Sequence, residues 1–72
     1  MSHPLIRAMR SMKARDGLTW QQLADAADLS VDSLNDRLAE RVPFRWPEIE
    51  AIAGAFGVKP SVLIDQAESL AA

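Results

Sequence analysis

The chain has 72 residues, no cysteine, and eight Lys and Arg residues against ten Asp and Glu residues, which gives a net charge of −2. This length allows one domain, residues 1–72, with one small core, and the lack of cysteine excludes disulfides and thiolate metal sites. No apolar run reaches the roughly 18 residues that span a bilayer and no long apolar signal is present, so we expect a soluble intracellular protein without a membrane partner.

Positive charge is concentrated in the first two thirds of the chain. Residues 1–47 hold seven of the eight Lys and Arg residues and six of the acidic residues, so they sum to +1, whereas residues 48–72 sum to −3. A net acidic chain argues against nucleic acid as a partner, because nucleic-acid-binding domains usually carry a basic surface. The N-terminal part is therefore the one that we expect to contact a polyanion.

Helix start and stop signals predict five short helices, and strand signals are absent. The first helix is expected to begin at Pro4, a favourable first-turn residue, and to end at about Arg15. Gly17 then supplies the left-handed residue that ends many helices. On the surface of this helix, Arg10 is the side chain that we expect to reach a phosphate if the partner is a nucleic acid.

The second helix has the strongest start signal in the chain, the segment LTWQQL. Thr19 can cap this helix, and Gln22 can return the hydrogen bond, as in a capping box. The helix is expected to run to Ala27 and to be followed by a tight turn at Asp28, because Asp tolerates the left-handed conformation better than most residues.

Ser30 can cap a third helix, in which Leu34 and Leu38 form a buried face at i, i+4 spacing. The following segment ERVPFRWP, residues 40–47, is expected to be a loop, because its two prolines cannot both lie inside one regular helix. A fourth helix then ends at Gly57, and Pro60 begins a fifth.

The stretch GLTWQQLADAADLSVDSLNDRL resembles the helix-turn-helix of lambda-repressor and Cro-type (XRE-like) DNA-binding domains. The tail RVPFRWPEIEAIAGAFGVKPSVL is similar to their last two helices, above all in the short actinobacterial and actinophage members. The resemblance covers about residues 5–66. It implies an all-α fold, a compact five-helix lambda-repressor-like bundle with its helix-turn-helix at about residues 19–40.

The same resemblance implies sequence-specific binding of a double-stranded DNA operator by a small transcriptional regulator, a phage repressor or Cro-like protein. Such a protein would work in the cytoplasm of a bacterial cell or a phage-infected host. Base edges would be read from the third helix by Val31, Asp32, Ser33 and Asp36. Phosphates would be contacted from the helix starts, the groove wall and the loop by Thr19, Trp20, Gln21, Asn35, Arg37, Arg41 and Arg45.

Family members often dimerise through the last helix, where Ile64 or Leu70 could form the contact between two copies of the chain. A homodimer would bind two half-sites about one helical turn of DNA apart. The resemblance thus adds a second copy of the chain to the expected partners.

Five positions depart from the family pattern: Trp20, Asp28, Asp36, Glu40 and Arg45. The three acidic residues among them bring carboxylates to or near the proposed interface. A carboxylate in the major groove can accept from cytosine N4, but it also repels phosphates. Asp36 has the alternative of pairing with a neighbouring arginine, and Asp32 that of stabilising the positive end of its helix. The loop arginines could likewise be solvated or paired instead of anchoring phosphates.

These carboxylates leave a second function open, a protein-interaction module whose helix-turn-helix surface binds a protein partner, such as a host-directed or antitoxin-like factor. Exposure of Trp20 would point to such an interface, whereas Trp46 is expected to pack at the core or its rim. We expect no enzyme, cofactor or metal, because Ser30 and Ser33 lack a neighbouring base and His3 is the single histidine.

Overall fold

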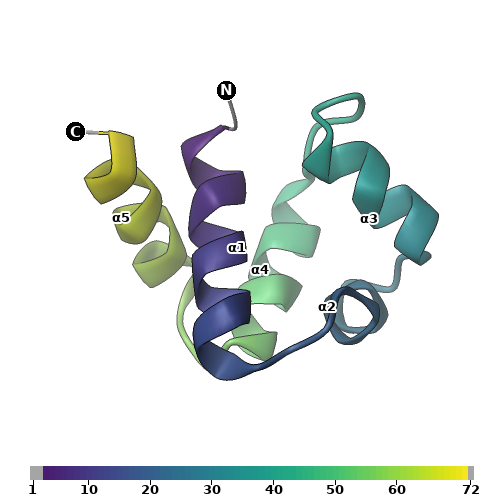
Figure 1. The fold of residues 1–72 in the computed structure, drawn as a ribbon, viewed down its shortest axis with the longest axis horizontal. Coiled ribbons are helices and arrows are strands. Elements are labelled where there is room, and N and C mark those ends of the chain that lie inside the picture. The colour runs from purple at the N-terminus through teal and green to yellow at the C-terminus, as the bar shows by residue number, and fades with distance from the viewer. Residues whose placement is uncertain (1–2, 72) are drawn as a thin grey trace.

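The computed structural model describes residues 3–71, except for the side chains of residues 70 and 71. This part of the chain contains five α-helices and no strand (Figure 1). The helices are α1 (Pro4–Asp16), α2 (Trp20–Ala26), α3 (Val31–Leu38), α4 (Trp46–Ala55) and α5 (Pro60–Ala71). The predicted all-α class and the number of helices are therefore confirmed for this part of the chain. None of these helices is long and apolar enough to cross a membrane.

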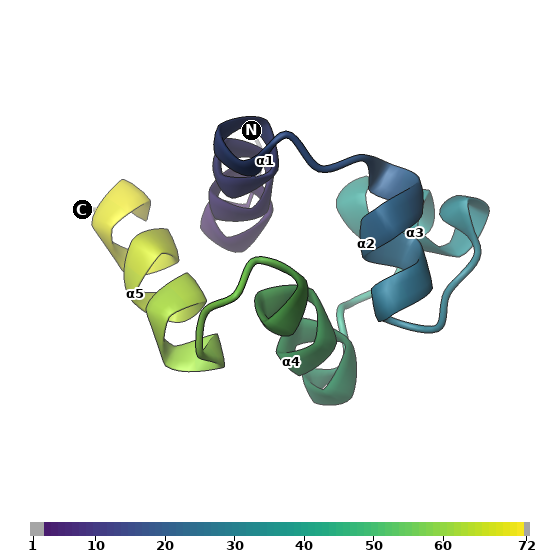
Figure 2. The same cartoon turned by 90° about the horizontal axis from the view of Figure 1, so that it is seen from below.

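Helix α1 lies in the middle of the molecule, between α5 on one side and the α2–α3 pair on the other (Figure 1). Helix α4 lies behind α1 in the view of Figure 1, and Figure 2 shows it between α5 and α2, both of which it contacts. Helix α3 packs mainly on α2 and forms the edge of the molecule opposite α5. This arrangement leaves one long side of α3 without a helical neighbour.

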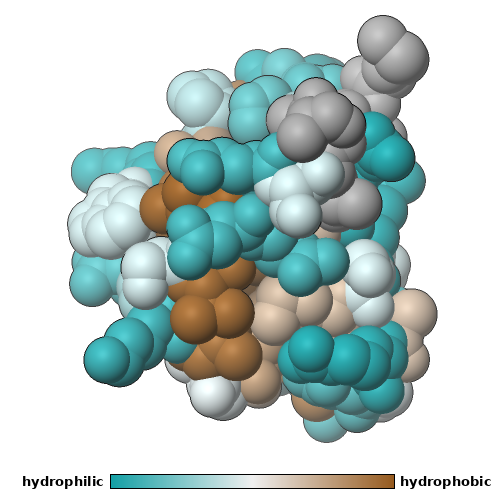
Figure 3. Space-filling model, turned by 90° about the vertical axis from the view of Figure 1, so that its left-hand side faces the viewer, coloured by the Kyte–Doolittle hydropathy of each residue, from teal (hydrophilic) through white to brown (hydrophobic). Residues whose placement is uncertain are grey.

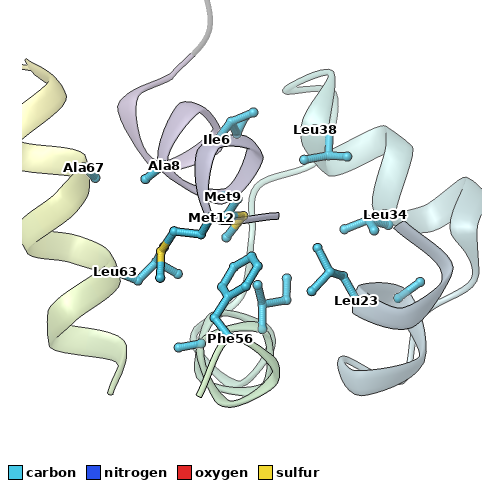
Figure 4. Close-up of a cluster of buried hydrophobic side chains, with 13 residues drawn as sticks. Ile6, Ala8, Met9, Met12, Leu23, Leu34, Leu38, Phe56, Leu63 and Ala67 are labelled. Carbon is cyan, nitrogen blue, oxygen red and sulfur yellow. The ribbon is translucent and has the colours of Figure 1, made fainter. Parts of the chain in front are cut away.

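A single core joins the five helices (Figure 4). Each helix contributes one of its largest fully buried side chains, which are Met9, Leu23, Leu34, Ile52 and Leu63. Burying a side chain of this size stabilises the fold by about 1.5–3 kcal/mol relative to leaving it in water. Because Leu34 belongs to this shared core, α3 is held in one orientation even though it lies at the edge.

Each of the helices α1 to α4 is followed, within two residues of its end, by a residue in the left-handed conformation. Gly17 and Gly57 take this position with φ angles of 68° and 73°, as their sequence context predicted. Asp28 also adopts it, at φ 57°, which confirms the expected turn between α2 and α3. At the end of α3 the position is held by Glu40, at φ 63°, where a side chain with a Cβ atom is strained.

The loop before α4 is shorter than predicted, and Trp46, which was expected in that loop, is more exposed than predicted. Helix α4 begins at Trp46, so Pro47 lies inside its first turn. A proline is tolerated there because the first N–H groups of a helix have no partner within the helix. Trp46 is 52% exposed and is not among the residues packed against the core, so the expectation that it packs at the core or its rim is wrong.

Candidate nucleic-acid interface

The start of α2 is fixed by the capping box that the sequence predicts. Thr19 Oγ1 accepts from the Gln22 backbone N–H at 3.1 Å, and Gln22 Oε1 accepts from the Thr19 backbone N–H at 2.7 Å. The neighbouring Gln21 side chain donates to Asp25 Oδ1 at 2.8 Å. The predicted phosphate contacts Thr19 and Gln21 are thus exposed but already hydrogen-bonded within α2.

The predicted base-reading residues of α3 differ in how free they are. Ser30 Oγ caps the helix by accepting from the Ser33 backbone N–H at 3.0 Å, and the two hydroxyl groups are also hydrogen-bonded. Val31 is partly buried against the core, whereas Asp32 is exposed. Asp32 is therefore the side chain of this group that projects most freely from the first turn.

Arg37 lies in a different place from the one predicted. Its Nε and Nη2 donate to the two carboxylate oxygens of Glu48 at 2.8 and 3.0 Å, and its Nη1 donates to the Ser33 carbonyl at 2.9 Å. The side chains of Arg37 and Glu48 are only 13% and 10% exposed. With its guanidinium committed to α4, Arg37 holds the third helix in position, and we withdraw it from the predicted phosphate contacts.

Glu48 serves two partners at once. The Arg37 guanidinium lowers the pKa of the Glu48 carboxyl, assisted by a 2.9 Å hydrogen bond from the Arg45 backbone N–H and opposed by burial. That backbone bond completes the start of α4, where the Arg45 side chain makes no capping hydrogen bond. Arg45 itself is exposed and remains a predicted phosphate contact.

Asp36 and Arg41 form an ion pair on the surface beside α3. Arg41 Nη2 and Nε both donate to Asp36 Oδ1, at 2.9 and 3.1 Å. The pairing that the sequence left as an alternative for Asp36 is therefore present, with Arg41 as the partner. The two side chains are 46% and 65% exposed, and exposed pairs of this kind are worth about 0–1 kcal/mol, so the pair opens easily.

Four of the predicted phosphate-binding residues meet around one open groove of about 490 Å³, which we call the Trp20 groove. Its walls come from α1, α2, α3 and the loop after α3, and its lining consists of Arg10, Trp20, Asn35, Leu38, Ala39 and Arg41. Two guanidinium groups, an amide and an indole therefore face one space beside α3.

A further cation, Lys13, lies over the Trp20 ring and is not among the predicted phosphate contacts. The Lys13 ammonium lies 4.8 Å from the centroid of the Trp20 ring, a distance at which a cation is attracted to the ring face. Lys13 follows Arg10 by three residues, so both lie on one side of α1, and this spacing is the signal that could have identified it. Trp20 is partly buried against the core, unlike the freely exposed aromatic of a protein-docking surface.

No protein-family model matches the chain, and none of the curated proteins matches it. Among solved structures, it is similar to the crystal structure of the clp gene regulator ClgR from C. glutamicum, with a TM-score of 0.82. The two proteins share a fold. The alignment covers 97% of this chain and 91% of the ClgR chain, at 24% sequence identity. At that identity the likeness shows the arrangement of the helices alone.

The predicted dimer contact lies on the side of the molecule that α5 covers. Ile64 lines an apolar groove of about 370 Å³ together with Leu5, Ile49 and Ala67. Hydrophobic atoms form a strip on this face of the molecule (Figure 3). The side chain of Leu70, the other predicted contact, lies outside the described side chains. Dimerisation through α5 stays a prediction.

Proposed function

We propose that the chain is a small transcription regulator that binds double-stranded DNA in a sequence-specific manner, and that it acts as a binding protein, not as an enzyme. The observation that carries this proposal is the Trp20 groove, which brings Arg10 and Arg41 together beside α3 on a chain that is acidic as a whole. The Lys13 ammonium over the Trp20 ring adds a third positive charge next to this groove. The fold shared with a gene regulator supports the same reading.

In this proposal α3 enters the major groove, where Asp32 and Asp36 face base edges. A carboxylate accepts from cytosine N4, so cytosine is the base that these residues favour. The Trp20 groove and the exposed Arg45 bind phosphates, which fixes the position of α3 on the DNA but does not select the sequence. Bound at an operator in the manner of a phage repressor or Cro-like protein, the regulator would block access of RNA polymerase.

A two-fold dimer fits this mode of binding, because one eight-residue helix reads only a few base pairs. We propose the apolar groove at Ile64 as the contact between the two copies. Such a dimer would bind half-sites about 34–36 Å apart on one face of the DNA.

The alternative, a protein-interaction module, uses the acidic side chains Asp32, Asp36 and Glu40 with Trp20. In the structure Trp20 is partly buried and covered by Lys13, and Asp36 is neutralised by Arg41. Both observations weaken the acidic and aromatic surface that this alternative requires, so we favour DNA as the partner.

The direct test is selection of bound duplexes from a random library, followed by fluorescence anisotropy with the selected duplex and with a mixed-sequence pool. We expect retention of duplexes with a shared motif that contains cytosine, and binding of the mixed pool that weakens as salt rises from about 50 to 200 mM. Retention of no duplex at low salt would overturn the proposal and favour a protein partner.

A further inference from the structure

We infer that Asp36 is a specificity-determining residue that acts through Arg41. On non-specific DNA its carboxylate competes with phosphates for the Arg41 guanidinium. At a specific site a base donates a hydrogen bond to the carboxylate, and Arg41 is released to a phosphate. The inference rests on the proposed function and adds to it a coupling between base reading and phosphate binding. It concerns the ion pair beside α3 and the Trp20 groove that Arg41 lines.

The two residues are brought together by the main chain as well as by their charges. The backbone N–H of Arg41 donates to the Asp36 carbonyl at 2.9 Å, and the left-handed Glu40 between them turns the chain back over the end of α3. The side chain of Arg41 therefore starts from a point next to Asp36. A carboxylate and a DNA phosphate present the same kind of acceptor to a guanidinium, so Asp36 occupies the place of a phosphate.

The pair is also free to exchange partners. Both Arg41 donors go to Asp36 Oδ1, and no hydrogen bond to Oδ2 is present among the described residues. The Arg41 side chain is mostly exposed and that of Asp36 is nearly half exposed, in contrast with the enclosed pair of Arg37 and Glu48. A cytosine N4 amino group in the major groove can therefore compete for the carboxylate, and Arg41 is then available to a phosphate.

On non-specific DNA no base takes the Asp36 carboxylate, so a phosphate gains Arg41 only by breaking the ion pair, and this contact with the phosphate is weaker. At a specific site the contact with the base and the contact with the phosphate form together. Asp36 thus lowers the affinity for the many wrong sites more than the affinity for the right one, which raises the ratio between them.

The test compares wild type, Asp36→Asn, Arg41→Gln and the double variant on the mixed pool and on the selected duplex, across a range of salt. On the mixed pool, Asp36→Asn should raise the affinity by up to about fivefold at 0.1 M salt, because the exposed ion pair no longer competes with phosphates for Arg41, and should steepen the log–log salt slope by up to about 0.9. In the Arg41→Gln background the same substitution should change the affinity far less. On the selected duplex Asp36→Asn should gain little or lose affinity.

Asp65→Asn is the matched control, because it removes the same charge from an exposed side chain of α5, outside the proposed DNA contacts and without an ion pair among the described residues, and it should leave the slope nearly unchanged. Arg41→Gln alone should flatten the slope on the selected duplex and leave it nearly unchanged on the mixed pool. Equal gains from Asp36→Asn in both Arg41 backgrounds, or no gain, would overturn the inference while DNA binding itself stands. A wild-type protein that binds no duplex overturns the inference together with the proposed function.

Discussion

Arg37 and Glu48, which lie eleven residues apart in the sequence, join α3 to α4 through two parallel hydrogen bonds of 2.8 and 3.0 Å. The pair is nearly enclosed, and Glu48 also accepts from the backbone N–H of Arg45, the residue that precedes α4. Removing one partner of such a pair leaves the other without compensation, which costs more than the pair itself contributes. This relationship therefore governs both the stability of the fold and the position of α3.

Glu48→Gln is expected to lower the free energy of unfolding by about 1.5–3 kcal/mol, because it removes the charge that compensates the Arg37 guanidinium. Urea denaturation followed by circular dichroism measures the change. Glu50→Gln is the matched control, since Glu50 is an exposed carboxylate two residues away in the same helix, and its loss should have little effect. Equal destabilisation by the two substitutions would contradict a special role for Glu48.

The same pair predicts a loss of stability in acid. The pKa of Glu48 is lower in the folded chain than its ordinary value of 4.5, so its contribution is complete above that value and is lost as the pH falls through the lower, folded value. The difference in unfolding free energy between wild type and Glu48→Gln should therefore shrink as the pH is lowered below about 4.5. A difference that stays constant down to pH values near 2 would show that ionisation of Glu48 is not involved.

Glu40→Gly is expected to stabilise the chain by about 0.5–1 kcal/mol, because glycine adopts the left-handed conformation without the strain of a Cβ atom. Glu40 holds this conformation at φ 63° after the end of α3. Thermal unfolding of Glu40→Gly and Glu40→Gln separates backbone strain from charge. If Glu40→Gln raises the melting temperature as much as Glu40→Gly, the gain comes from the lost carboxylate and not from the backbone.

The two tryptophans report on different parts of the surface. Trp20 lines the groove, whereas Trp46 is 52% exposed at the start of α4. In a Trp46→Phe variant, added DNA should change the emission of Trp20, because phosphates draw the Lys13 ammonium away from the indole. A Trp20→Phe variant should show the smaller change. A response confined to Trp46 would place the DNA elsewhere.

Local signals predicted the fold well, because a cap depends on residues only a few positions apart. The bonds between Thr19 and Gln22, the left-handed Asp28 and the proline at the start of α5 all follow from short-range chemistry. The start of α4 was placed too late because Pro47 was read as a helix breaker, although its position in the first turn makes it harmless.

Pairings between distant residues could not be predicted in the same way. Nothing in the spacing of Arg37 and Glu48 indicates that they meet, since their contact depends on how α3 crosses α4. The exposure of Trp46 and the position of Lys13 over Trp20 likewise depend on how helices pack. For this reason neither the pairing of Arg37 with Glu48 nor the position of Lys13 was predicted. Arg10 and Arg41, both predicted as phosphate contacts, line one groove in the structure, and their contact with DNA stays a prediction.

The salt dependence of binding to a mixed duplex pool tests the central claim, that the Trp20 groove binds DNA phosphates, most directly. Arg10→Gln should flatten the log–log slope by about 0.9, because one phosphate contact is lost. Lys59→Gln removes the same charge from an exposed position before α5 and should leave the slope nearly unchanged. Identical slopes for Arg10→Gln and wild type, or an equal effect of Lys59→Gln, would contradict the claim.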